Sequence, residues 1–88
     1  MIFTVIRIMR MEYRYTTLLR YSPAQIRKSL RLRRMVHALS AYCDSGRWLK
    51  DYAADEQGLL PRWLKRGVLS QDGLYDLLCS LDDSDETA

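Results

Sequence analysis

The chain has 88 residues, 48% of them hydrophobic and 28% charged, and a net charge of +3. This length suits one small domain, and the composition argues against a globally disordered chain. No run of about 18 apolar residues occurs, which excludes a membrane-spanning helix from the sequence.

The first twenty residues predict a helix that begins near Val5. Apolar residues recur at helical spacing, with arginines beside them. The apolar residues are Ile8, Met11, Tyr15 and Leu18, and the arginines are Arg7, Arg10 and Arg14. Residues 2–6 are rich in β-branched side chains, so we expect them to be frayed or extended. A targeting or membrane-surface segment is the less favoured interpretation of this arginine-rich start.

The second predicted helix has the clearest start. Ser22 is placed as its N-cap, Pro23 stands at the first helical position, and Gln25 completes a capping box. We predict one continuous helix to Cys43, ended by residues 44–46, Asp-Ser-Gly. Its expected buried residues are Leu32, Val36, Leu39 and Cys43.

Three shorter helices are predicted to follow. The first covers residues 47–57, with Trp48 in the core, and the second covers 61–66, with Gly67 at its end in the left-handed conformation. Ser70 caps the third, whose expected buried residues are Leu74, Tyr75, Leu77, Leu78 and Leu81. The prediction is an all-α helical bundle with one domain, residues 1–81, and a disordered acidic tail, residues 82–88.

The stretch LKRGVLS, residues 64–70, is the most motif-like part of the chain. A phosphate-binding loop would need a different glycine and lysine spacing after a strand. We therefore interpret it as a join between two helices, with Ser70 as a weaker candidate for an anion contact.

Residues 42–78 resemble a bacterial family of small helical proteins known as domain of unknown function 4298. The pattern is Tyr, Ser, Trp, then D-x-x-x-D-E-x-G-x-L-P, then L-K-R-G-V-L-S-x-D-G-x-Y-x-L-L. The residues that carry it are Tyr42, Ser45, Trp48, Asp51, Asp55, Glu56, Gly58, Leu60, Pro61, Leu64 to Ser70, Asp72, Gly73, Tyr75, Leu77 and Leu78. The resemblance implies an all-helical fold and no known activity. Trp63 departs from the pattern, which has a polar or acidic residue there.

No set of residues indicates catalysis. His37 is the only histidine, and Cys43 and Cys79 form no close pair, so we interpret them as a solvated imidazole and two buried thiols of a cytoplasmic protein. Asp51, Asp55 and Glu56 could hold a hard cation, but pairing of the two aspartates with arginines of the first two helices is the favoured interpretation. We predict no catalytic residue, no metal, no cofactor and no small-molecule substrate.

The charge distribution favours binding instead. Residues 1–50 hold 11 Lys and Arg against two acids, a balance of +9, whereas residues 51–88 hold three against nine, a balance of −6. Such parts can neutralise each other within the fold, between two copies as a homodimer, or against a partner.

Two surfaces are candidates. Trp63 with Arg62, Lys65 and Arg66 combines residue types that dominate protein interfaces, although a core position for Trp63 is equally open. We predict a non-catalytic protein-interaction or regulatory module on this basis. The alternative is a nucleic-acid-associated protein, or an inhibitor of a nucleic-acid machine, that acts through a basic stripe at i, i+4 and i+7. Arg27, Arg31 and Arg34 have that spacing, and Lys28 completes the stripe.

Overall fold

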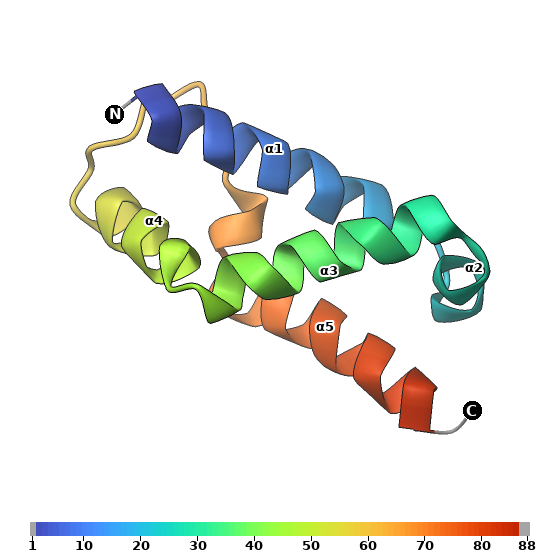
Figure 1. Cartoon of the computed structure of the whole chain (residues 1–88). Coiled ribbons are helices and arrows are strands. Elements are labelled where there is room, and N and C mark those ends of the chain that lie inside the picture. Colours follow the sequence, from blue (N-terminus) through green and yellow to red (C-terminus); the bar gives the residue numbers. More distant parts are fainter. Residues whose placement is uncertain (1, 87–88) are drawn as a thin grey trace.

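Helical periodicity is the dominant local signal of the chain, and helices dominate its structure. The structure, a computed structural model, describes residues 2–86, and within them the side chains of residues 2–70 and 72–81. It contains the helices α1 (Ile2–Leu18), α2 (Pro23–Lys28), α3 (Leu30–Asp44), α4 (Arg47–Glu56) and α5 (Gln71–Glu86), and one 3-10 turn, η1 (Gly67–Leu69) (Figure 1). No strand occurs in that range, so the predicted all-α fold is confirmed.

Helix α1 begins at Ile2, which corrects the expectation that residues 2–6 are frayed or extended. Val5 packs against the core and Ile8 is fully buried. The burial of an apolar face contributes more to helix stability than the small unfavourable propensity of β-branched residues. Tertiary packing therefore sets the start of this helix.

The predicted continuous helix over residues 22–43 is two helices. Ser22 caps α2 as predicted: its hydroxyl accepts a hydrogen bond from Gln25 N at 3.3 Å, and Gln25 Oε1 accepts from Ser22 N at 2.9 Å. At Ser29 the backbone becomes extended, with φ −108° and ψ 120°, and the hydroxyl accepts from Leu32 N at 3.2 Å. A serine hydroxyl competes with the helical backbone for such bonds, so Ser29 ends α2 and caps α3.

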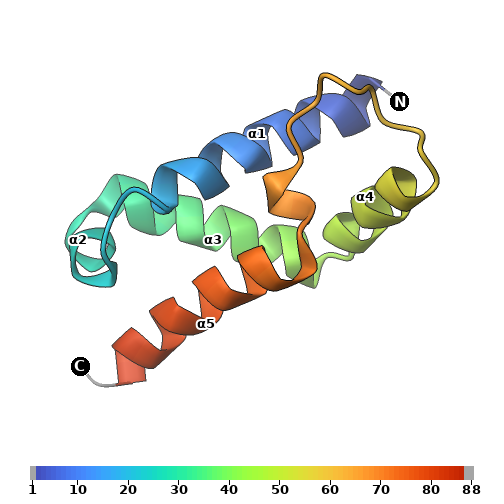
Figure 2. The same cartoon turned by 180° about the vertical axis from the view of Figure 1, so that it is seen from behind.

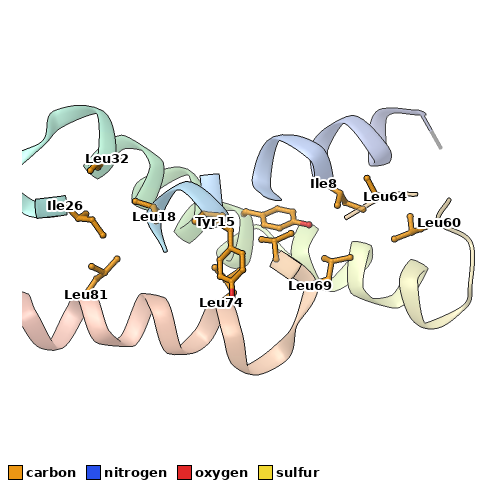
Figure 3. Close-up of a cluster of buried hydrophobic side chains, with 13 residues drawn as sticks. Ile8, Tyr15, Leu18, Ile26, Leu32, Leu60, Leu64, Leu69, Leu74 and Leu81 are labelled. Carbon is orange, nitrogen blue, oxygen red and sulfur yellow. The ribbon is translucent and has the colours of Figure 1, made fainter. Parts of the chain in front are cut away.

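This break has a tertiary consequence. Helix α3 lies along α1, whereas α2 turns away and contacts α5 (Figure 1). Ile26 is thereby buried beside Leu81 at the far end of the core (Figure 3). One straight helix over residues 22–43 could not both lie along α1 and place Ile26 against α5.

The predicted short helix over residues 61–66 is absent. Helix α4 ends at Glu56, Gly58 takes φ 71°, and residues 57–66 form turns that cross the N-terminal half of α1 (Figure 2). Leu60 and Leu64 are buried in this segment, and Figure 3 shows both beside Ile8 of α1. So short a segment gains little from its own helical hydrogen bonds, and unlike the six-residue α2 it has no capping box, so the burial of these two leucines sets the path.

Ser70 begins α5 as predicted, since its hydroxyl accepts from Gly73 N at 3.3 Å. Leu74 and Leu81 face the core, but Tyr75 was wrongly placed in the buried set and is 68% exposed. Each residue advances about 100° around a helix, so Tyr75 points away from the side that Leu74 buries. The helix continues to Glu86, past the predicted domain boundary at residue 81, and residues 87 and 88 of the predicted tail lie outside the described residues.

Candidate functional site

A buried carboxylate connects three helices. Asp51 of α4 is 1% exposed, and its oxygens accept hydrogen bonds from the Arg7 guanidinium of α1 and the Tyr42 hydroxyl of α3. The bond from Arg7 Nε measures 2.9 Å. The predicted pairing of Asp51 with an arginine of the first helix is confirmed. Tyr42 lies in the core although it was not among the predicted buried residues, whereas Val36 and Cys43, which were, are half-buried.

In the cluster of Arg7, Tyr42 and Asp51, the two hydrogen-bond donors have raised pKa values. Burial, and next the hydrogen bond to Asp51, raises the pKa of the Tyr42 hydroxyl far above its ordinary value of 10.0. The hydrogen bond to Asp51 likewise raises the pKa of Arg7. Because neither group changes its charge near neutral pH, the cluster suits the joining of helices better than proton transfer.

We expect the fold to lose stability in alkaline solution because of Tyr42. Its folded-state pKa is raised, so its contribution is complete below the unfolded pKa of about 10 and declines as the pH rises above it. There the unfolded chain releases a proton that the folded chain retains, which lowers the free energy of unfolding by up to about 1.4 kcal/mol per pH unit. Urea unfolding between about pH 9 and pH 11 measures this decline.

The decline should be shallower in Tyr42→Phe than in the wild type. Tyr13→Phe, at an exposed position of α1, is the matched control and should keep the wild-type slope. Equal slopes for the wild type and Tyr42→Phe would show that another group causes the alkaline loss.

Glu12 fastens η1 to α1. Its Oε1 accepts a hydrogen bond from Val68 N at 2.7 Å, and Val68 O accepts from Trp48 Nε1 at 2.9 Å. Gly67 was predicted to adopt the left-handed conformation, but in the described residues only Gly46 and Gly58 have positive φ. A Cβ at Gly67 would lie 3.2 Å from Glu12 Oε2, so the close approach of this carboxylate favours glycine there.

The four residues of the predicted partner-binding set differ in their surroundings. Trp63 is 67% exposed, which excludes the core position that the sequence left open, and Arg62 and Lys65 are exposed as well. Arg66 is half-buried: it pairs with Asp55 and donates from Nη2 to Pro61 O at 2.9 Å. Arg66 therefore holds residues 57–66 against α4, and the predicted pairing of Asp55 with the first two helices is wrong.

Trp63 borders an open groove against α1. The groove has a volume of about 340 Å³, is mostly apolar, and is lined by Met9, Glu12, Tyr13, Thr16, Trp63, Leu64 and Lys65. We call it the Trp63 groove. Met9 and Tyr13 are 50% and 60% exposed, and they also border a second hollow of about 370 Å³ with Arg10, Arg14 and Met35. Met9 and Tyr13 thus form an apolar ridge between two hollows.

The ridge belongs to a second apolar stripe on α1. Its residues, Ile2, Ile6, Met9 and Tyr13, follow the spacing i, i+4, i+7 and i+11, and all four are exposed. Sequence reasoning found only the inner stripe, although the same periodicity could have revealed this outer one. A helix that is apolar on two faces is usually covered on both, and here the outer face has no cover within the described chain.

The pattern of a protein family described as domain of unknown function (DUF4298) matches residues 8–86. The chain belongs to this family. The match spans α2, α3, α4, η1 and α5 and all of α1 after its first six residues, so it extends well beyond the resemblance over residues 42–78. Comparisons with curated proteins and with solved structures find no match in either case.

The predicted basic stripe is divided in this DUF4298 domain. Arg27 and Lys28 lie on α2, Arg31 and Arg34 lie on α3, and the break at Ser29 separates the pairs. All four side chains are exposed, but they do not form the single straight helix face that the i, i+4, i+7 spacing predicted.

The remaining reactive side chains of the DUF4298 domain are not assembled into one site. His37 is exposed and borders a hollow of about 190 Å³ with Arg33 and Ser40. Cys43 and Cys79 are half-buried free thiols. Over the side chains that the structure describes, no three His, Cys, Asp or Glu residues form a metal-binding group. None of the helices within residues 2–86 is long and apolar enough to cross a membrane.

Proposed function

We propose that this DUF4298 domain is a non-catalytic protein-interaction module and that its binding surface is the Trp63 groove with the outer stripe of α1. One observation carries the proposal: Trp63, Tyr13 and Met9 are all at least half exposed around one groove. Scattered apolar residues are ordinary on protein surfaces, whereas a contiguous cluster of large ones is typical of an interaction site. Tryptophan, tyrosine and arginine are also the residues that contribute most to binding free energies.

The surroundings of the ionisable groups support the non-catalytic part of the proposal. The Asp51 carboxylate already accepts hydrogen bonds from Arg7 and Tyr42, and the Asp55 carboxylate already pairs with Arg66. A catalytic centre needs a nucleophile or base with a partner that orients it beside a space for substrate. The polar side chains that border the Trp63 groove are Thr16, Lys65 and Glu12, and the Glu12 carboxylate already accepts a hydrogen bond from Val68 N.

The test is capture of a partner by the full-length chain from nuclease-treated native lysate, followed by titration of the purified partner. We expect one defined protein, and we expect Trp63→Ala to weaken its binding by about 30-fold or more. Tyr75→Ala is the matched control, because Tyr75 is equally exposed but lies on α5. Equal binding by the wild type and Trp63→Ala would contradict the proposal for this surface.

The alternative, association with nucleic acid, is supported by the exposure of Arg27, Lys28, Arg31 and Arg34 on neighbouring helices. It predicts that the chain retards any duplex at low salt, that binding weakens steeply as salt rises, and that Arg31→Glu reduces it. Loss of all captured material on nuclease treatment would favour this alternative over protein binding.

A further inference from the structure

The outer stripe of α1 constrains the shape of what covers it. From Ile2 to Tyr13 the stripe follows three turns of one helix, a length of about 16 Å. The hollows on both sides of the Met9–Tyr13 ridge are each large enough for a big apolar side chain, and this ridge separates them. This relief matches a second helix with apolar residues at i, i+3 or i+4, and i+7.

The charges around the stripe constrain the chemistry of its cover. Arg10 and Arg14 border one hollow, Lys65 borders the other, and the exposed Arg62 directly precedes Trp63 in the chain. None of these four side chains has an ion pair among the side chains described in residues 2–70 and 72–81. The one acid that borders the groove, Glu12, accepts a hydrogen bond from Val68 N.

We infer that the Trp63 groove and the outer stripe of α1 bind an acidic amphipathic helix of a partner protein, an inference that rests on the proposed function. The apolar face of that helix covers Met9, Tyr13 and Trp63, and its Asp and Glu residues lie against the basic rim formed by Arg10, Arg14, Arg62 and Lys65. Charge complementarity of this kind orients a partner and speeds its association. A lipid surface is the less suitable cover, because a flat bilayer does not fill two hollows.

A displayed peptide library tests the inference on the full-length chain. The peptides are helical, about 16 residues long, with apolar residues at i, i+3, i+4 and i+7 and with Glu, Lys, Gln or Ser drawn equally elsewhere. We expect selection to enrich Glu over Lys beside the apolar face. The best peptide should also bind about tenfold more tightly than its version with Lys for Glu.

Variants of the chain locate the binding. Tyr13→Ala and the charge reversal Lys65→Glu should each weaken binding of the selected peptide. Lys65 is exposed and lies outside the helices, so its reversal leaves the core intact. The matched controls are Tyr75→Ala and Arg31→Glu, which change exposed residues on α5 and α3. Circular dichroism of each variant separates lost binding from lost folding.

Several results would overturn the inference. Enrichment of Lys, indifference to charge or no enrichment at all would each exclude an acidic helix. Trp63-dependent binding to phosphatidylcholine–phosphatidylglycerol vesicles would identify a membrane as the cover, and a dimer that Trp63→Ala dissociates would identify a second copy. If a captured partner depends on Trp63 but binds through a basic or extended segment, the proposed function stands and only this inference fails.

Discussion

Replacing Asp51 with alanine is expected to lower the free energy of unfolding by about 3–5 kcal/mol. The carboxylate is almost completely buried and accepts hydrogen bonds from Arg7 and Tyr42. Its removal leaves the Arg7 charge and the Tyr42 hydroxyl without their acceptor where water is excluded. Because the cluster joins α1, α3 and α4, the loss should affect the whole domain rather than one helix.

Urea unfolding at neutral pH measures this effect, and the midpoint of thermal unfolding should fall by more than about 12 °C. Asp44→Ala, at the exposed end of α3, is the control and should change stability little. The triple variant Arg7→Met, Tyr42→Phe, Asp51→Leu should recover much of the loss, because an apolar replacement leaves no uncompensated charge. Equal losses in Asp51→Ala and Asp44→Ala would show that the cluster contributes nothing specific.

Replacing Glu12 with alanine is expected to lower the free energy of unfolding by about 1.5–3 kcal/mol. The Glu12 carboxylate accepts a bond from Val68 N, and the Val68 side chain is fully buried. In the alanine variant this backbone N–H has no protein acceptor, and η1 loses its connection to α1. The segment that carries Trp63 runs directly into η1, so the variant should also weaken partner binding.

Two further variants separate the causes. Glu12→Gln keeps an acceptor but not the charge, so it should lose less stability than Glu12→Ala. Thr16→Ala changes an exposed residue that borders the same groove, and it should leave the unfolding midpoint near that of the wild type. If Glu12→Gln and Glu12→Ala have the same unfolding midpoint as Thr16→Ala, the hydrogen bond from Val68 N contributes no measurable stability.

Hydrogen bonds between near neighbours explain which turns were predicted correctly. Ser22 and Gln25 bond each other three residues apart, and Gly46, in the predicted stop at residues 44–46, takes positive φ just beyond the end of α3. Such features depend on a few consecutive residues and are therefore readable in a sequence. Ser29 makes the same kind of bond, but its neighbours also fit a helix interior, so the break was missed.

Contacts between distant residues explain the errors. The segment 57–66 is held by burial of Leu60 and Leu64 and by the pairing of Arg66 with Asp55, none of which is a local helix signal. The need for glycine at Gly67 comes from Glu12, which lies 55 positions earlier in the chain. The predicted partner-binding set was separated in the same way, since Trp63 is exposed while Arg66 is half-buried and paired with Asp55.

The amino-acid sequence by itself determined the helical class and the caps at Ser22 and Ser70, because these depend on periodicity or on residues within one turn of each other. It also determined the family, because the family pattern is a property of the sequence and matches residues 8–86. Only the tertiary structure decided that Asp51 joins three helices, that Glu12 holds η1, and that Met9, Tyr13 and Trp63 form one groove. Those outcomes depend on which apolar faces from distant parts of the chain pack together and exclude water. Because this packing involves the whole chain, it leaves no pattern within a short stretch of sequence.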